Sequence, residues 1–272
     1  MAIIKTTTEE LREGDIGMIG LPWDTNSSYL MGSAEAPTKI IESIDSPSAN
    51  YYTESLIDLN EHPRLKWLGD AELNNFMDIE SHLSKILKKG AIPFSLGGDH
   101  SVAYPVLRAV SRHVGKVTII QFDAHNDLYH DFEGNPYSHA SPFARIMEGD
   151  LAARLIQVGI RTMTTHQQQQ ASDLGVEVYS MQDLNLVDLS QIKEPLYISF
   201  DMDVLDPAFA PGVSHHEPGG MSTREAISML QSINAPIVGM DLVEYNPHRD
   251  PTGMTGMVAA KIAKEMLALL LR

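Results

Sequence analysis

The 272-residue sequence contains no cysteine. Without thiols, the chain forms no disulfide, has no cysteine nucleophile and cannot build a thiolate zinc site. Any bound metal must therefore be held by histidine, by carboxylates or by backbone oxygen atoms. The lack of cysteine also agrees with a cytoplasmic location, which we expect for this chain.

Long apolar runs are missing as well. No stretch approaches the roughly 18 residues that a membrane-spanning helix needs, and the opening MAIIKTTTEELREGD turns polar too early for a secretory signal. We therefore expect no membrane partner. Because the sequence shows no repeat, linker or change of composition, we expect one domain covering residues 1–272.

Positive charge is scarce. Lys and Arg number 20 against 36 Asp and Glu, which gives a formal net charge of −16. A phosphate backbone needs a basic surface, so nucleic acid is excluded as the expected partner. A negative field instead favours a small cationic molecule.

Short apolar runs alternate with amphipathic stretches along the chain. Helical periodicity is clearest in APTKIIESI, IESHLSKILKKG, STREAISMLQSI and the final TGMVAAKIAKEMLALLLR. Such alternation predicts a three-layer α/β/α sandwich with a mostly parallel central sheet. The six predicted strands lie in IGMIGLPW, AIPFSLGG, KVTIIQFD, RLIQVGI, PLYISFD and PIVGMDLVEY.

Polar side chains follow four of these runs, at the point where each strand ends. Ligands of open parallel sheets bind at the carboxyl ends of the strands, so the four groups predict one shared site. These residues are Asp99 and His100; Asp123, His125 and Asp127; Asp201 and Asp203; and Glu244.

The spacing within these groups indicates metal binding. Asp201 and Asp203 are two residues apart, so a strand would place them on the same side, where two carboxylates repel unless a cation neutralises them. Histidine together with carboxylates suits manganese, zinc or iron. Two histidines and four aspartates are too many ligands for one ion. They predict two metals roughly 3.5–4 Å apart and hence a hydrolase.

Each group alone has a simpler interpretation. GGDHS could be a turn in which Asp99 caps a helix, and acids at strand ends are often solvated loop residues. DMDVLD resembles a calcium loop, but Asp206 and Gly212 stand where an EF-hand needs Gly and Glu. The metal prediction therefore rests on the joint occurrence of the groups.

Three segments, GGDHS, DAHND and SFDMDVLDPAFAPG, resemble motifs of the arginase/agmatinase family of ureohydrolases. The similarity is collinear from IGLPWD to the last helix and includes YSHASPFARIMEG, EPGGMSTREA and GMDLVEYNP. It implies an arginase-like fold, two Mn²⁺ per chain, and hydrolysis of a guanidino or formimino group. It also implies a homo-trimer or homo-hexamer.

The resemblance implies two overlapping ligand sets, with Asp123 and Asp201 bridging the ions. One ion would be held by His100, Asp123, Asp127 and Asp201. The other would be held by Asp123, His125, Asp201 and Asp203.

The resemblance also implies three catalytic residues. Asp127 would carry a proton toward the leaving amine, His139 in YSHASPF would shuttle protons, and Glu244 in DLVEYNP would pair with the guanidinium. Without the resemblance, His139 would be a loop or core histidine and Glu244 a surface acid.

Other residues near the motifs have supporting or surface roles. Asp99 and Asp241 are predicted to orient metal ligands. His215 and His216 are predicted to form the pocket rim, and His130 and His166 to lie on the surface.

The resemblance points to agmatine as substrate, with putrescine and urea as products. The loop YHDFEGNPYSHASPF lacks the Asn/Thr/Ser pattern with which arginases bind an α-amino acid. A distal ammonium could meet Asp131, Glu133 or Glu217. The alternatives are guanidinobutyrate, guanidinopropionate, arginine and formiminoglutamate, and a guanidino acid would need a cation such as Arg145 or Arg161. Departures from the family pattern at Met31–Pro37 and Val213–Glu217 also bear on substrate choice.

Two other classes compete with this hypothesis. One is a deacetylase-like hydrolase with a single zinc, which the doubled ligand set disfavours. The other is a silent metal-binding protein. All six ligands, His139 and Glu244 are present, so the sequence shows no sign of lost activity.

Overall fold

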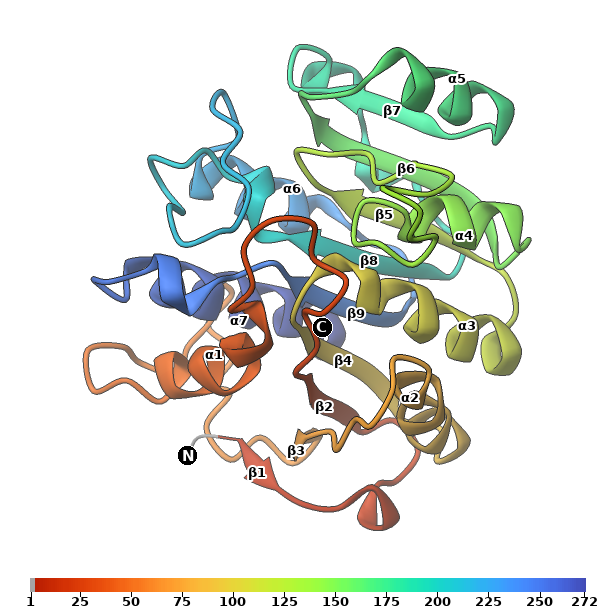
Figure 1. Cartoon of the computed structure of the whole chain (residues 1–272). Helices are drawn as coiled ribbons and strands as arrows, with labels where there is room; N and C mark the ends of the chain where they lie inside the picture. Colours follow the sequence, from red (N-terminus) through yellow and green to blue (C-terminus); the bar gives the residue numbers. More distant parts are fainter. Residues whose placement is uncertain (1–2) are drawn as a thin grey trace.

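A computed structural model describes residues 3–272, so the first two residues of the predicted domain lie outside the described part. Its centre is a nine-stranded sheet in the order β1-β3-β2-β4-β9-β8-β5-β6-β7 (Figure 1). Every pairing is parallel. The strands are β1 Ile4–Lys5, β2 Ile16–Leu21, β3 Leu65–Asp70, β4 Ile92–Gly97, β5 Val117–Phe122, β6 Ala152–Ile160, β7 Glu177–Ser180, β8 Leu196–Asp201 and β9 Ile237–Val243.

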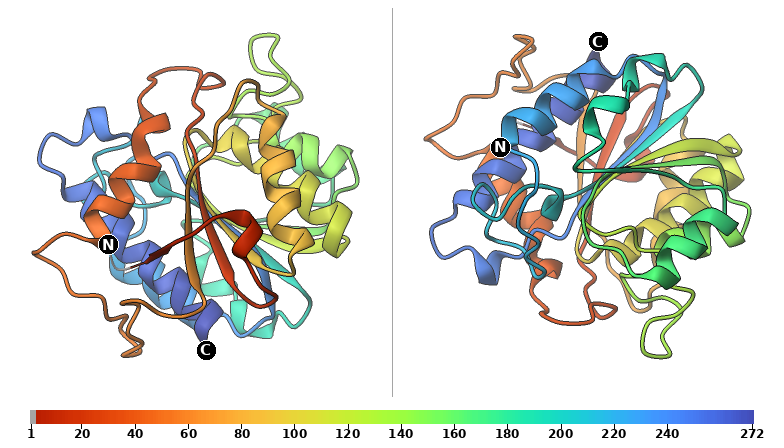
Figure 2. Two further views of the ribbon diagram at one scale, coloured as in Figure 1. Left: turned by 90° about the horizontal axis from the view of Figure 1, so that it is seen from below. Right: turned by 90° about the horizontal axis from the view of Figure 1, so that it is seen from above.

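Helices cover both faces of this sheet (Figure 2). Buried side chains of α1, α6 and α7 belong to one hydrophobic core, and those of α2 to α5 belong to another. This arrangement confirms the predicted three-layer sandwich. Among residues 3–272, no helix is long and apolar enough to cross a membrane. The helices are α1 Ala36–Ile44, α2 Asp78–Lys88, α3 Ala103–Val114, α4 Pro142–Glu148, α5 Thr165–Asp173, α6 Thr223–Ser232 and α7 Met254–Leu271.

The six predicted strands are all present, but three further strands were not predicted. β1 has two residues, and β7 is half-buried along its whole length. β3 interrupts its apolar run with Lys66 and ends in Gly69 and Asp70. β1 and β7 form the two edges of the sheet and β3 lies next to β1. Strands at or near an edge are buried less completely, so they lack the continuous apolar run that identifies the central strands.

Helix α6 begins with a capping box formed by Ser222 and Glu225. The Ser222 hydroxyl accepts a hydrogen bond from the Glu225 N–H at 3.2 Å, and the Glu225 carboxylate accepts one from the Ser222 N–H at 2.8 Å. This capping box satisfies two backbone donors that the first helical turn leaves without partners.

The segment between α1 and β3 is fastened to helices α6 and α7 by one carboxylate. Glu54 accepts two hydrogen bonds from the Arg224 guanidinium, at 2.8 and 2.6 Å, and lies 3.3 Å from Lys261 Nζ. The hydrogen bonds from Arg224 lower the pKa of Glu54 to about 2. The ionised carboxylate therefore links three distant parts of the chain.

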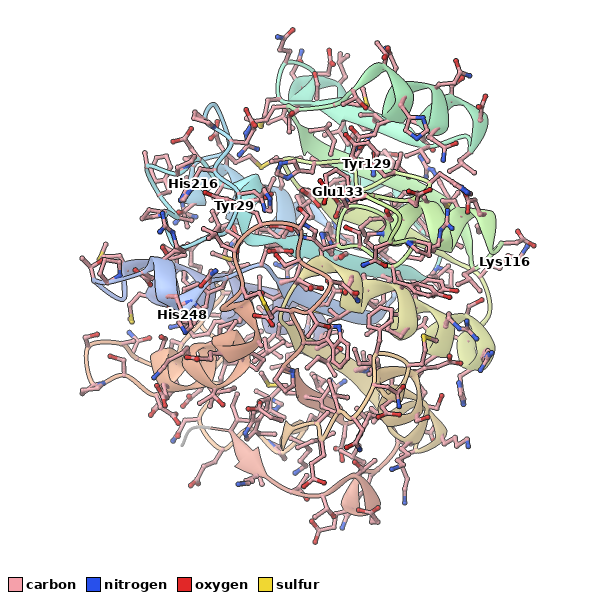
Figure 3. The ribbon with its side chains drawn as sticks, viewed as in Figure 1. Tyr29, Lys116, Tyr129, Glu133, His216 and His248 are labelled. Atoms are coloured by element: carbon pink, nitrogen blue, oxygen red, sulfur yellow. The ribbon has the colours of Figure 1, made fainter. Side chains whose placement is uncertain are left out.

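The carboxyl ends of four neighbouring strands meet at the middle of one sheet edge. β4, β9, β8 and β5 are consecutive in the sheet, and the predicted site residues follow directly after them. In Figure 3, Tyr29 and His216 lie near the carboxyl ends of the strands. Lys116, which directly precedes β5, lies at the amino ends.

Candidate dinuclear metal centre and active site

His100 lies at the centre of a buried acidic group. Its Nδ1 atom is 3.0 Å from Asp123 Oδ2, 3.2 Å from Asp127 Oδ2 and 3.1 Å from Asp201 Oδ2. All four side chains are buried. Potential ligand atoms of His100, Asp123 and Asp127 all lie within 4.8 Å of one another, which is the spacing of ligands around one ion.

A second group lies beside the first and shares Asp123 with it. His125 Nδ1 is 2.9 Å from Asp203 Oδ2 and 3.6 Å from Asp123 Oδ1. Potential ligand atoms of these three residues also lie within 4.8 Å of one another. The structure thus brings all six predicted metal ligands together as two overlapping groups.

The protonation of this centre fits a cation between the ligands. In the described part of the chain, the buried His100 Nδ1 makes no hydrogen bond although three carboxylate oxygens surround it. Burial, together with the Asp123 charge, raises the pKa of Asp127 to about 6. Burial alone would lower the pKa of His125, but the Asp203 and Asp123 carboxylates raise it to about 12. Divalent metal ions would satisfy this excess of buried negative charge.

Tight turns after the strands aim the carboxylates inward. Asp201 ends β8, and its side chain accepts a hydrogen bond from the Asp203 N–H at 2.7 Å. Asp203 in turn accepts one from the Ala124 N–H at 3.1 Å, which ties the turn after β8 to the loop after β5. Asp127, with φ of 48°, has left the extended conformation. The predicted i, i+2 strand geometry therefore gives way to turns that still bring the acids together.

Asp241 supports the centre through a serine. His100 Nε2 lies 2.9 Å from Ser199 Oγ, and this hydroxyl donates to Asp241 Oδ1 at 2.7 Å. Tyr197 donates to the other oxygen of Asp241 at 2.6 Å. Asp241 therefore orients the imidazole of His100 indirectly, through a connection between neighbouring strands.

Asp99 forms hydrogen bonds with two loops. Its carboxylate accepts hydrogen bonds from the N–H groups of Asn26 and Ser101, both at 3.0 Å. It therefore caps the turn after β4, as the simpler interpretation of GGDHS had it, and anchors the loop that follows β2. Asp99 thus acts on the turn that begins with His100 through this cap, and its role in orienting a metal ligand stays a prediction.

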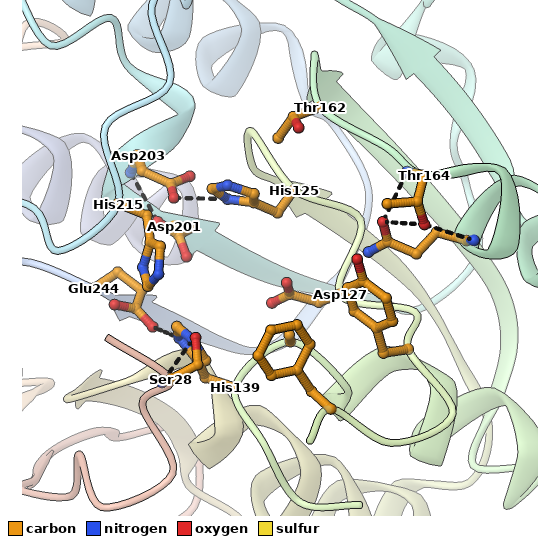
Figure 4. Close-up of a pocket in the computed structure, with 14 residues that line it drawn as sticks. Ser28, His125, Asp127, His139, Thr162, Thr164, Asp201, Asp203, His215 and Glu244 are labelled. Atoms are coloured by element: carbon orange, nitrogen blue, oxygen red, sulfur yellow. Dashed lines mark hydrogen bonds and ion pairs between the residues drawn. The ribbon is translucent and has the colours of Figure 1, made fainter. Parts of the chain in front are cut away.

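His139 and Glu244 form a buried pair next to the acidic groups (Figure 4). His139 Nδ1 lies 2.9 Å from Glu244 Oε1, and the same oxygen accepts a hydrogen bond from the His100 N–H at 2.8 Å. Burial alone would lower the pKa of His139, but Glu244 raises it to about 9. Burial would raise the pKa of Glu244, but His139 lowers it below its usual value.

Ser28, which the sequence did not suggest, holds the other side of His139. Its hydroxyl lies 2.8 Å from His139 Nε2, and its backbone N–H donates to the same nitrogen at 3.2 Å. Because a backbone N–H can only donate, Nε2 accepts when the ring is neutral, and the single proton then sits on Nδ1, facing Glu244. When the ring is cationic, as the raised pKa favours, Nε2 donates to the Ser28 hydroxyl instead. Ser28 carries no charge and lies far from His139 in sequence, so no sequence signal marked it.

A pocket of about 190 Å³ connects these groups to solvent. Besides the acids and histidines, its lining includes uncharged side chains, those of Tyr129, Phe132, Thr162, Thr164 and Gln167. Figure 4 shows Thr162 and Thr164 on the side of His125 and Asp127 that is away from Glu244. The two threonines and Gln167 were missed by the sequence analysis. They follow β6, so the strand-end rule that found the acids would also have indicated them.

The charged residues proposed for the far end of the substrate do not line this pocket. Asp131 accepts a hydrogen bond from the Gly134 N–H in its own turn, and Arg145 pairs with Glu148. Arg161 donates to backbone carbonyls, including those of Asp203 and Glu217, and so braces the site from outside. Glu133 and Glu217 are likewise absent from the lining.

The remaining histidines lie largely as predicted. His215 lines the pocket, with its ring centre 5.0 Å from that of His139, and His216 is exposed beside it. His130 and His166 are exposed.

Comparison with known proteins agrees with this geometry. The chain is 44% identical to a mitochondrial arginase of Medicago truncatula, covering 92% of this chain and 80% of that protein. It is 32% identical to an agmatinase of Bacillus anthracis, covering 94% and 91%. The solved structure of arginase from Medicago truncatula superposes with a TM-score of 0.89 at 44% identity, covering 94% of this chain and 87% of that one. A sequence model of the Arginase family matches residues 14–268, and the chain belongs to this family.

Proposed function

We propose that this chain binds two Mn²⁺ ions and hydrolyses the guanidino group of L-arginine, releasing urea and L-ornithine. Family membership and the overlapping acidic groups support the guanidino chemistry. The choice of arginine rests on one observation, the uncharged part of the pocket lining formed by Thr162, Thr164 and Gln167.

The six predicted ligands would hold the two ions. Asp123 belongs to both groups, so it would help to hold both ions, and the resemblance implies the same for Asp201, whose carboxylate lies 3.1 Å from His100 Nδ1. Manganese bound there would supply a water molecule of lowered pKa as the nucleophile and a positive field for the negative charge that develops on the substrate.

The side chains around the centre orient the substrate and move protons. Glu244 Oε1 already accepts hydrogen bonds from two groups, so Oε2 is the oxygen left to receive an N–H of the guanidinium. Asp127 carries a proton toward the leaving amine. His139, which reaches the pocket, exchanges protons with solvent.

The wall at the far end of the pocket suits a carboxylate. Thr164 caps α5, and Gln167 Oε1 accepts hydrogen bonds from the Thr164 N–H at 3.0 Å and hydroxyl at 3.1 Å. This leaves the Gln167 amide N–H groups as donors toward a ligand. The amino end of a helix also favours negative charge.

Charge balance then separates the guanidino compounds. No Lys or Arg lines the pocket, so the single negative charge of guanidinobutyrate or guanidinopropionate would have no full counterpart. The ammonium of agmatine would face the positive end of α5. The α-carboxylate and α-ammonium of arginine cancel, so this end of the substrate offers a carboxylate but carries no net charge. This favours arginine over agmatine, which the sequence had suggested.

A urea-release assay with added Mn²⁺ tests this proposal. We expect kcat/KM for L-arginine to exceed the values for agmatine, guanidinobutyrate and guanidinopropionate by at least roughly tenfold, because hydrogen bonds to a charged group contribute about 1.5–3 kcal/mol. A preference for agmatine would overturn the choice of substrate. Absence of urea from all four compounds would overturn the chemistry.

Gln167→Glu sharpens the test. Glutamate at this position preserves the capping box of α5 but places a negative charge at the far wall. The ratio of kcat/KM for arginine to that for agmatine should fall roughly 10- to 100-fold. Gln168→Glu, on the exposed side of the same helix, is the matched control and should leave the ratio unchanged.

A further inference from the structure

Two glutamines lie buried beneath the metal-binding loop Asp123–Asp127. Gln121 on β5 and Gln157 on β6 are register partners in neighbouring strands, and neither has any solvent-exposed surface. Burying an amide is unfavourable unless its polar atoms find hydrogen bonds. Two fully buried amides in neighbouring strands therefore need specific hydrogen-bond partners.

The two amides form a directed chain of hydrogen bonds that ends on a metal ligand. Gln157 Nε2 donates to Gln121 Oε1 at 2.6 Å, and Gln121 Nε2 donates to Asp123 Oδ2 at 2.7 Å. Asp123 is the carboxylate that both acidic groups share. The same Oδ2 atom lies 3.0 Å from His100 Nδ1, so the chain reaches the middle of the proposed centre.

The same amides also hold the backbone of the loop. Gln121 Nε2 donates to the carbonyl of His125 at 3.2 Å, and Gln157 Nε2 donates to the carbonyl of Asn126 at 2.6 Å. Carbonyl oxygens only accept, which fixes the orientation of both amide groups. The loop has left the sheet at this point, so the glutamines replace the strand partners that its carbonyls would otherwise lack.

We propose that Gln121 and Gln157 are positioning residues that hold Asp123 and the loop 123–127 in the geometry that binds the metals. This inference rests on the proposed metal centre. The glutamines act by hydrogen bonding and carry no charge, and Gln157 acts on Asp123 through Gln121. Groups that orient a metal ligand in this way raise the affinity for the metal.

The melting temperature and the affinity for Mn²⁺, measured on the same variants, separate this role from a purely structural one. Methionine has nearly the length of glutamine and can be buried without hydrogen bonds. Replacing a buried polar pair with apolar groups of similar shape is often neutral or stabilising. Removing only one partner instead leaves the other unpaired and destabilises the protein. The metal-free double variant Gln121→Met/Gln157→Met should therefore melt closer to the wild-type temperature than either single variant does, whereas its affinity for Mn²⁺ should not recover.

The experiment measures Mn²⁺ binding to the substrate-free protein, with electron paramagnetic resonance reporting the free ion. For Gln121→Met we expect a dissociation constant raised roughly 10- to 100-fold. Gln157→Met should give a smaller increase, and the double variant should bind no more tightly than Gln121→Met does, because Gln157 also holds the Asn126 carbonyl. Ser95→Ala, at a buried hydroxyl on β4 with no partner in the described part of the chain, is the matched control and should bind as wild type does.

The outcomes distinguish this inference from the proposed function. Wild-type Mn²⁺ affinity in folded Gln121→Met and Gln157→Met would overturn the positioning role and leave the proposed function intact. Wild-type protein that binds Mn²⁺ but releases no urea would overturn the function alone. Wild-type protein that binds no Mn²⁺ would overturn both. If Gln121→Met does not fold, as judged by circular dichroism, the Mn²⁺ affinity of Gln157→Met still tests the positioning role, because Gln157 acts on Asp123 through Gln121.

Discussion

Replacing Glu244 with glutamine should remove charge from the substrate site without disturbing the fold. Glu244 is 4% exposed, and its Oε1 atom accepts hydrogen bonds from the His100 N–H at 2.8 Å and from His139 Nδ1 at 2.9 Å. A glutamine carbonyl oxygen can accept both bonds in the same place. The variant loses only the negative charge and one acceptor, the oxygen that we assign to the guanidinium.

The expected size of the effect follows from this geometry. A hydrogen bond to a charged group contributes about 1.5–3 kcal/mol, and the amide nitrogen that replaces Oε2 would oppose the N–H groups of the substrate. A loss of about 3 kcal/mol corresponds to a fall in kcat/KM of roughly 100-fold. The pKa of His139, which Glu244 raises to about 9, should also fall toward its usual value.

Two measurements check the Glu244→Gln prediction. Urea release from L-arginine at saturating Mn²⁺ gives kcat/KM, and nuclear magnetic resonance titration of the metal-free protein gives the pKa of His139. Glu217→Gln, an acid-to-amide change outside the pocket lining, is the control and should retain wild-type kinetics. If Glu244→Gln kept kcat/KM within about threefold of wild type while binding Mn²⁺ normally, the assignment of Glu244 to the guanidinium would be refuted.

Three further perturbations have defined outcomes. Dialysis against EDTA should abolish urea release, and added Mn²⁺ should restore it and raise the melting temperature; activity that survives complete metal removal would contradict the metal centre. In Gly98→Ala, the new Cβ would lie 2.0 Å from the backbone oxygen of Trp23, so calorimetry should show destabilisation by about 1–3 kcal/mol. Glu54→Gln should cost about 1 kcal/mol at pH 7, a surface-pair magnitude because the carboxylate is partly solvated. Since folding lowers the pKa of Glu54 from 4.5 to about 2, this contribution is present above pH 4.5 and disappears as the pH falls toward 2. If Glu54→Gln lost the same free energy of unfolding near pH 2 as at pH 7, the assigned ion pair would be contradicted.

The central part of the sheet was predictable because burial on both faces leaves a continuous apolar run in the sequence. β4, β5 and β8 read as IPFSLG, VTIIQF and LYISFD, and nearly every residue in them is buried. β1 and β7 have no such run because they lie at the edges, where one side of the strand is open. The predicted trimeric or hexameric assembly and the cytoplasmic location stay predictions, since both depend on more than one isolated chain.

The acidic side of the site was predictable for a different reason. Carboxylates and histidines directly after buried strands are costly unless a ligand compensates them, so the joint occurrence of several such groups, those of His100, Asp123 and Asp203 among them, could be recognised. Neutral side chains carry no such cost, so only their place after a strand could have indicated Thr162 and Thr164, and Ser28 lacks even that context. The role of Ser28 depends on a loop that Asn26 fastens to Asp99, and this contact spans 73 positions in the sequence.

The strand order explains why chemistry could be predicted more readily than substrate choice. β9 is the last strand in the chain but lies between β4 and β8, so Glu244 reaches the site only when the two halves of the sheet join. The Glu244 N–H then donates to the Gly98 carbonyl at 2.8 Å, which couples this join to the turn that carries His100.

The acids that need a metal thus come from the centre of the sheet, where strand positions are fixed by the buried core. The wall that selects the substrate follows β6, next to an edge strand, and consists of uncharged residues. Substrate preference can therefore change there, as Gln167→Glu would test, without altering any residue of the metal centre.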